Sequence, residues 1–340
     1  MTTEFSAKPT GPPAVSIGIP VFNASRWLAE AVDSALAQTY GDLEILVVDN
    51  ASTDGTLELA RSYTDDRVHI FTASKTISAV ANHNRTIRLA RGAYLKFLHG
   101  DDELLPDCLA EMIGLAERDS QIGLVFAQRE IRLEKDTPAE RAWAQHYGSI
   151  HERIGDLEPI NDGGTLFRQL LAQEFAENLI GEPSSVLIRR EALERVGLMN
   201  ERLHQIGDLD LWARIMLSCK IGYVDEVLSV YRHHGSSVTA DNADTRRDWL
   251  DRLWFFESLL AEPGLGSDRE AVLRLRRKAL RRALRAQAGR LSRGDVAPDL
   301  LGYGLYRLQA AVGRRPTFYE RLVRRGDSAA TPSNRQPASR

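Results

Sequence analysis

The sequence predicts an α/β fold, Rossmann-like, with a mostly parallel central sheet flanked by helices and an all-helical C-terminal extension. Two observations support this prediction. Over the first 127 residues, short apolar runs typical of buried strands alternate with segments of helical periodicity. From residue 245 to about 325 the pattern is almost purely helical. In such sheets ligands bind beyond the carboxyl ends of the parallel strands, so the loops there are the first candidates for a site.

Each element has its own signal in the chain. Apolar runs predict strands at residues 14–21, 43–50, 68–73, 93–100, 122–128 and 184–190. Capping residues and apolar periodicity predict helices at residues 26–38, 54–62, 78–91 and 208–220, and another that begins at Pro106. Residues 221–234 predict a short strand pair, and residues 129–165 look irregular. Gly and Pro predict breaks in the helical region near residues 263–266, 294–298 and 313–316.

Composition divides the chain unevenly. Residues 271–326 contain 15 Lys or Arg but only three Asp or Glu, whereas the whole chain has a net charge of −3. This basic segment is either a solvated helical bundle packed on the α/β domain or a surface for anionic membrane. Its apolar residues can share one helix face: Leu273, Leu280, Leu284 and Leu291. Aromatic residues are sparse across the basic helix itself, which argues against nucleic acid as a partner.

We predict four segments: a disordered N-terminus (1–13), the α/β domain (14–240), the basic helical extension (241–326) and a disordered tail (327–340). No apolar stretch approaches the ~18 residues of a spanning helix, and the N-terminus has no signal-peptide core. Cys108 and Cys219 are expected to be buried free thiols. These features favour a cytoplasmic location, with peripheral contact at the inner face of the plasma membrane left open.

Polar residues follow three of the predicted strands, in the segments 20–23, 49–52 and 99–102. None of these loops is a G-x-G-x-x-G or G-x-x-x-x-G-K-[ST] motif, so a dinucleotide or P-loop site is not indicated. Asp101 and Asp102 are adjacent carboxylates that repel each other unless a cation lies between them. Such hard oxygen ligands suit Mg²⁺ or Mn²⁺ with substrate phosphates. The alternative is a cap for the helix that begins at Pro106.

Three other polar segments also have a functional and a structural interpretation. The loop from Asp49 to Gly55 is either a pocket for a base or ribose, or a turn with a helix cap. Asp208 and Asp210 either favour a helix dipole, or supply a general base facing a metal–phosphate site. The segment 231–234, YRHH, offers cations to phosphate, or is a solvated loop.

Taken in order, IPVFN, VVDNASTDGT, the region of Asn84, FLHGDDELLP, GDLDLW and YRHH resemble family 2 glycosyltransferases of the GT-A fold, over roughly residues 14–240. The resemblance implies inverting transfer of a sugar from a nucleotide-diphosphate sugar to an acceptor hydroxyl. It further implies Mn²⁺ or Mg²⁺, a UDP-sugar donor by default, a glycan or lipid-linked acceptor, and a place in bacterial-type cell-surface polysaccharide or glycolipid synthesis. From their irregular pattern and their position in the chain, we expect residues 129–180 to form an acceptor-side lid.

The resemblance also assigns roles to residues. Asp208 is the expected catalytic base, and Asp102 the expected metal ligand, with His234 as a second candidate. The residues expected to bind the nucleotide sugar are Pro20, Phe22, Asn23, Asp49, Asn50, Asn84, Asp101 and Arg232.

The chain departs from the family pattern at four positions. Asn50 stands where many relatives have Asp, and His83 where Arg is frequent. His99 occupies the first Asp of the Asp-x-Asp motif, and Gly207 replaces the Glu before the base. These departures keep a catalytically inactive nucleotide-sugar-binding subunit as an alternative. A nucleotidyltransferase is a further alternative, against which the missing glycine-rich phosphate loop counts.

Overall fold

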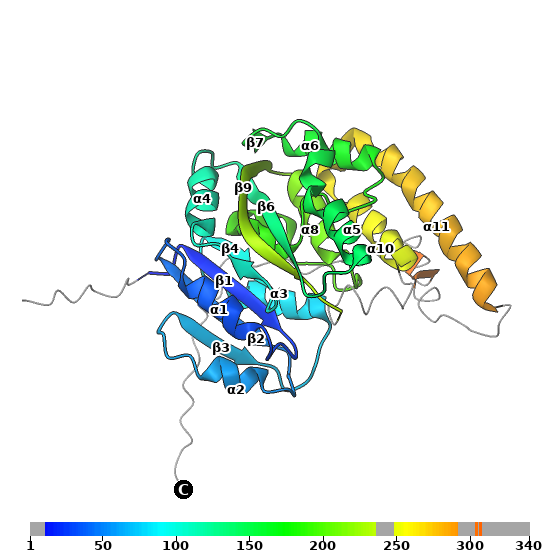
Figure 1. Cartoon of the computed structure of the whole chain (residues 1–340). Helices are drawn as coiled ribbons and strands as arrows, with labels where there is room; N and C mark the ends of the chain where they lie inside the picture. Colours follow the sequence, from blue (N-terminus) through cyan, green and yellow to red (C-terminus); the bar gives the residue numbers. More distant parts are fainter. Residues whose placement is uncertain (1–10, 236–247, 292–302, 305, 308–340) are drawn as a thin grey trace, which may run out of the picture.

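The computed structural model describes residues 11–235, 248–291, 303–304 and 306–307. Its strands form one sheet in the order β3-β2-β1-β4-β8-β6-β9-β5, and β7 pairs with β9 (Figure 1). The strands are β1 (Val15–Val21), β2 (Leu43–Asp49), β3 (Val68–Thr72), β4 (Tyr94–Phe97), β5 (Glu103–Leu104), β6 (Ile122–Leu133), β7 (Ile160–Asn161), β8 (Val186–Arg189) and β9 (Lys220–His233).

Helices cover both faces of this sheet. The helices are α1 (Leu28–Leu36), α2 (Thr56–Arg61), α3 (Ala79–Leu89), α4 (Cys108–Ala116), α5 (Pro138–Gly148), α6 (Gly163–Ala172), α7 (Arg190–Val196), α8 (Gly207–Met216), α10 (Asp248–Ala261) and α11 (Arg269–Leu291). Buried side chains of α1, α2 and α4 share one core with β1 and β2. Those of α3, α6, α7, α8 and α10 share a second core on the opposite face. The predicted α/β fold with a flanked central sheet is therefore confirmed.

The parallel part of the sheet positions the predicted site loops. Strand β1 runs parallel to β2 and β4, and β2 runs parallel to β3, so their carboxyl ends share one edge. In the other half, β6 and β9 are parallel, while β8 is antiparallel to its neighbours β4 and β6. A Cβ at Gly18 would lie 2.2 Å from Thr86 Cγ2, so only glycine lets α3 approach β1 this closely.

Two sequence predictions about local structure were wrong. The region 129–165 is ordered: β6 continues to Leu133 and is followed by α5, a 3₁₀ turn (Ile150–Ile154), β7 and the start of α6. Residues 221–234 form one strand instead of a pair. Asp225 and Glu226 fall where the register of β9 against β6 shifts, so a bulge accommodates these exposed acids without ending the strand. The lid role of residues 129–180 stays a prediction.

The described C-terminal helices pack on the α/β domain. Leu253, Phe255 and Leu259 of α10 belong to the same core as α8, and Val272, Ala279 and Ala283 of α11 are buried with them. The predicted break at 263–266 is a 3₁₀ turn, Pro263–Asp268. The predicted breaks at 294–298 and 313–316, and the predicted disorder of residues 1–10 and 327–340, lie outside the described residues. No helix in the described ranges combines the length and apolarity needed to cross a membrane.

Candidate active site

The loops after β1 and β2 are hydrogen-bonded to each other. The Asn23 N–H donates to Ser52 Oγ (2.9 Å), and the Thr53 N–H donates to Asn23 Oδ1 (2.9 Å). The Ser25 N–H donates to Asp54 Oδ2 (3.1 Å). Asn23 has a φ of 51°, in the left-handed region that Asn tolerates better than most residues. The two predicted binding loops therefore act as one unit.

Pro20 and Phe22 flank this unit with different exposure. Pro20 is half-buried at the end of β1. Phe22, next to Asn23, exposes 50% of its surface, and few other large apolar side chains among the described residues are as exposed. An aromatic ring held in solvent at the ligand-binding edge of a sheet is available for stacking on a flat ring.

Asp49 and Asn50 have internal partners that shape the loop around them. Asp49 is fully buried and accepts hydrogen bonds from the Ser52 N–H (3.1 Å) and Thr72 Oγ1 (2.7 Å). Asn50 forms a reciprocal pair with the main chain of Ile77: its Nδ2 donates at 2.8 Å and its Oδ1 accepts at 2.9 Å. Asn50 therefore fixes the segment before α3.

Asn84 connects α3 to the loop that precedes α8. Its Nδ2 donates to the carbonyl of Met199 and to Glu201 Oε1, both at 2.9 Å, and its Oδ1 accepts from the Met199 N–H at 2.9 Å. Because the amide is 1% exposed and used in three hydrogen bonds, its observed role is to position that loop.

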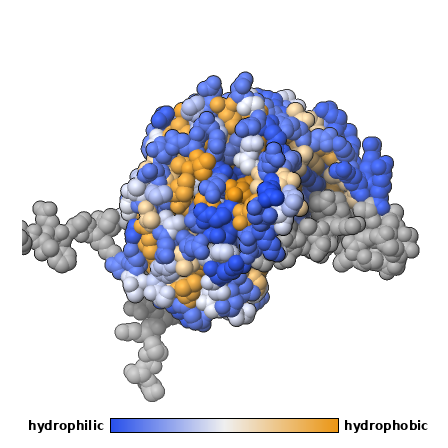
Figure 2. Space-filling view, viewed as in Figure 1, coloured by the Kyte–Doolittle hydropathy of each residue, from blue (hydrophilic) through white to orange (hydrophobic). Residues whose placement is uncertain are grey.

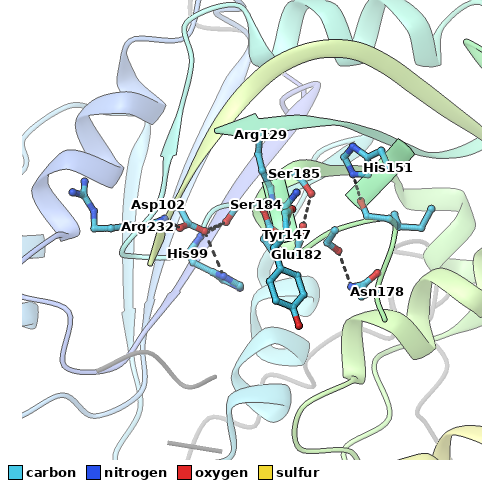
Figure 3. Close-up of polar contacts among 12 residues, drawn as sticks. His99, Asp102, Arg129, Tyr147, His151, Asn178, Glu182, Ser184, Ser185 and Arg232 are labelled. Carbon is cyan, nitrogen blue, oxygen red and sulfur yellow. Dashed lines mark hydrogen bonds and ion pairs between the residues drawn. The ribbon is translucent and has the colours of Figure 1, made fainter. Parts of the chain in front are cut away.

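Asp102 lies at the centre of a polar cluster (Figure 3). Ser184 Oγ donates to its Oδ2 at 2.6 Å, and the Arg232 N–H donates to its Oδ1 at 3.0 Å. Burial, together with the adjacent charge of Asp101, raises the pKa of Asp102 well above its usual value. The helix-cap alternative fails for this residue, because α4 begins at Cys108 and its N-cap is Asp107.

The donor set around Asp102 suits a divalent cation. One ligand atom each from His99, Asp101 and Asp102 lie within 4.8 Å of one another. Burial alone would raise the pKa of Asp101. Its hydrogen bond with His234 and the nearby imidazoles of His99 and His234 lower the pKa by more, so that it lies below its usual value. Two carboxylates and an imidazole are acceptable ligands for Mn²⁺, and the carboxylates also for Mg²⁺. The residues present therefore fit the ion that the family resemblance implies.

Arg232 and His234 lie around this cluster but use their side chains in different ways. The guanidinium of Arg232 pairs with Glu30 and Glu103 and stacks over the ring of Trp27 at 4.0 Å, so two carboxylates already neutralise it. His234 Nε2 lies 3.0 Å from Asp101 Oδ2. His234 thus contacts the cluster through Asp101.

Asp208 lies in the first turn of α8 without a cation beside it in the described contacts. Asn178 Nδ2 donates to its Oδ2 at 2.9 Å, and its own helix contributes the Leu209 N–H to Oδ1 at 2.8 Å. Burial, followed by the charge of Glu182, raises the pKa of Asp208 to about 6. A carboxylate with a pKa near neutrality is suited to accept a proton. A Cβ at the preceding Gly207 would lie 3.2 Å from Val80, so a larger residue there would be crowded.

Asp210, two residues further on, has a structural role. Its side chain is fully buried, pairs with Arg214 at 2.9 Å and accepts a hydrogen bond from Ser258 of α10. The two acids of the GDLDLW segment therefore have different partners: Asp208 contacts Asn178, and Asp210 ties α8 to α10.

A segment that the sequence analysis did not single out connects the two acidic centres. Asn178 donates a hydrogen bond to Asp208. Ser184 donates to Asp102, and Glu182, between Asn178 and Ser184 in the chain, pairs with Arg129 of β6 at 2.7 Å (Figure 3). The charge of Glu182 raises the pKa of both aspartates, so all three carboxylates share one electrostatic environment. Two sequence predictions touched this segment, the lid over residues 129–180 and the strand at 184–190, but neither assigned a role to Asn178, Glu182 or Ser184.

Comparison with known proteins identifies the group to which this arrangement belongs. The family model described as "Glycosyl transferase family 2" matches residues 16–197, more than half of the chain. The chain belongs to glycosyltransferase family 2. The predicted family is therefore confirmed.

Two relatives illustrate where this glycosyltransferase stands in the family. It is 33% identical over 251 residues to MT1568 of Mycobacterium tuberculosis, an alignment that covers 74% of this chain and 77% of the relative. It is 25% identical over 256 residues to TuaG of Bacillus subtilis, covering 72% and 92% of the two chains. The name of TuaG assigns it to teichuronic acid biosynthesis as a glycosyltransferase.

Solved structures show that the glycosyltransferase has the GT-A fold. TarS of Staphylococcus aureus (residues 1–349, with UDP-GlcNAc) superimposes with a TM-score of 0.59 at 14% identity, over 78% of this chain and 71% of TarS. The mannosyltransferase PcManGT of Pyrobaculum calidifontis, with GDP-Man and Mn²⁺, gives a TM-score of 0.54 at 19% identity, over 91% and 82%.

Proposed function

We propose that this glycosyltransferase moves a sugar, with inversion, from a nucleotide-diphosphate sugar to an acceptor hydroxyl, with a UDP-sugar as the default donor. One observation carries the proposal. A carboxylate suited to accept a proton, Asp208, and a metal-suited cluster around Asp102 are both held by the segment 178–185. Structural neighbours in complex with UDP-GlcNAc and with GDP-Man and Mn²⁺ support the donor class.

Each group of residues would have its own role in binding or catalysis. Asp102 would hold a Mn²⁺ or Mg²⁺ ion, with Asp101 beside it and His234 as a second candidate ligand, and the ion would neutralise the diphosphate leaving group when bound. Phe22 would stack on the base, in a pocket whose walls Pro20, Asn23 and the Asp49–Asn50 loop build. Asp208 would take the proton from the acceptor hydroxyl as that oxygen attacks the anomeric carbon from the face opposite the leaving group.

The first test is a panel of thermal-unfolding measurements with UDP-, GDP- and dTDP-sugars, each with and without Mn²⁺. Because a ligand at about 100 times its Kd stabilises the native state by roughly 2.7 kcal/mol, the true donor should raise Tm by several degrees. We expect one nucleotide class to do so, and only with the ion. Nucleoside triphosphates are measured alongside, and a shift with these instead of the sugars would favour a nucleotidyltransferase. Binding of a donor without turnover on any acceptor would favour an inactive binding subunit.

We further propose a glycan or lipid-linked acceptor of cell-surface polysaccharide or glycolipid synthesis, reached by peripheral contact with anionic membrane from the cytoplasmic side. TuaG supports the pathway class by its name. The outward side of α11 is hydrophilic (Figure 2), and its exposed arginines include Arg274, Arg281, Arg282 and Arg285. Arg277 is also exposed but pairs with Glu270. Of the predicted apolar face, Leu284 is 52% exposed, whereas Leu273 and Leu280 pack partly against the core. The side chain of Leu291 lies outside the described residues.

Sedimentation with lipid vesicles tests the membrane contact. Each basic residue near an anionic surface contributes about 1 kcal/mol, so wild-type protein should bind vesicles that contain phosphatidylserine and dissociate in high salt. Changing Arg274, Arg281, Arg282 and Arg285 together to Glu should abolish the binding. Equal binding to neutral vesicles, or unchanged binding of the quadruple variant, would count against a contact through α11.

A further inference from the structure

Both ring nitrogens of His99 lie close to other polar side chains. Its Nδ1 lies 3.7 Å from Asp102 Oδ2, and its Nε2 lies 3.2 Å from Nε2 of His83 on α3. The His99 N–H donates to Ser184 Oγ (3.0 Å), and the Asp102 N–H donates to the His99 carbonyl (3.1 Å). A tight turn and a buried serine therefore fix His99 relative to Asp102.

The hydrogen-bond chain determines which ring nitrogen of His99 carries a proton. His83 Nδ1 lies 2.8 Å from the carbonyl oxygen of Ala79, and a carbonyl only accepts, so His83 Nδ1 carries the hydrogen. A neutral imidazole has one N–H, so His83 Nε2 is then an acceptor. The hydrogen shared with His99 must come from His99 Nε2. This arrangement requires no charged ring, and it leaves a lone pair on His99 Nδ1.

That lone pair faces a carboxylate. When Asp102 is ionised, the nitrogen and the carboxylate oxygen are two electron-rich atoms 3.7 Å apart, and they repel each other unless a cation joins them. The separation is shorter than two ordinary metal–ligand bonds of about 2.0–2.2 Å each laid end to end, so one ion can touch both atoms. Metal-binding histidines commonly donate their other N–H to a fixed acceptor, which is the part that His83 plays here.

We propose that His99 is a nitrogen ligand of the divalent ion, oriented by His83, and that it makes the site prefer Mn²⁺ over Mg²⁺. An imidazole nitrogen is a poor ligand for Mg²⁺, which favours oxygen, whereas transition-metal ions accept nitrogen and oxygen together. His83 is a positioning residue that selects the tautomer of His99. The inference rests on the proposed function, because the ion in question is the one that would accompany the donor diphosphate.

Pulsed electron paramagnetic resonance of Mn²⁺ tests the ligand directly. The full chain with Mn²⁺ and UDP should show spin-echo modulation from a coordinated nitrogen. In His99→Asp, which supplies oxygen instead, Mn²⁺ should still bind but without that modulation, and its preference over Mg²⁺ should fall on the order of tenfold. In His234→Gln the modulation should persist.

A second variant covers the case in which His99→Asp does not fold. His83→Phe keeps a ring against Phe97 but removes the acceptor for His99, and it should weaken Mn²⁺ binding by about 10–100-fold. Bound Mn²⁺ without nitrogen modulation in the wild type, or modulation that persists in His99→Asp, would overturn the inference and leave the proposed function standing. If Mn²⁺ does not bind with UDP or any donor sugar, the inference and the metal-dependent function both fail.

Discussion

Asp208→Asn should lower the rate of sugar transfer by about 10²–10⁴-fold, the usual contribution of a general base, while donor binding and Tm stay close to wild type. The amide is isosteric, and its oxygen can still accept the hydrogen bond from Asn178, whereas the contact with the adjacent Leu209 N–H is lost. Because burial already disfavours the charged carboxylate, removing the charge imposes no cost on folding. Initial rates, Tm and donor affinity of the purified variant provide the three measurements.

The pH profile gives an independent check on the same residue. The pKa of Asp208 is raised to about 6, and only the ionised carboxylate can accept a proton. The turnover rate should therefore be constant above this value and fall tenfold per pH unit below it. In Asp208→Asn the residual rate should show no such step. A step of the same position in the variant would assign the pKa to another group.

Asp210→Asn is the matched control, since it alters the second acid of the same helix turn. Asp210 is paired with Arg214 and both side chains are fully buried. Removing one partner of a buried ion pair leaves an uncompensated charge and costs about 3–5 kcal/mol. This variant should lose stability in urea unfolding, whereas Asp208→Asn should not. If the two variants behave in the opposite way, the assignment of base and structural acid must be exchanged.

Asp102→Asn should abolish the dependence of donor binding and turnover on the divalent ion. A bound ion stabilises the charge on the leaving group by several kcal/mol. Losing the ligand that holds the ion should therefore lower the rate by roughly 10²–10³-fold. The measurements are turnover and the rise in Tm that Mn²⁺ produces together with the donor sugar. That rise should disappear in the variant. The substitution also removes the repulsion between Asp101 and Asp102, so the ligand-free protein should lose little stability.

Asp107→Asn serves as the control for Asp102. Asp107 is an exposed acid five residues away at the start of α4, and its carboxylate accepts a hydrogen bond from Thr39 outside the cluster. The metal dependence of this variant should match wild type. An equal loss in both variants would point to general electrostatics at this edge instead of a coordinated ion.

Local pattern predicted most of the fold. The apolar runs at β1, β2, β3, β4, β6 and β8, and the periodicity of α1, α3 and α8, are properties of short windows, which is why their positions agree with the structure within a few residues. Where the local signals conflict, prediction failed. The acids at 225–226 are typical of a turn, yet the pairing of β9 with β6 on both sides keeps the strand continuous.

The sequence by itself determined the fold class and the family. It also placed Asp49 and Asp102 at the ends of strands and Asp208 at the start of a helix. The tertiary structure decided how these side chains are used. Ser184 reaches Asp102 across 82 positions of the chain, and Glu30 and Glu103 neutralise Arg232. The meeting of His83 with His99 fixes which nitrogen faces the carboxylates. Such contacts depend on how helices and loops far apart in the chain pack together, and periodicity within a segment carries no information about them.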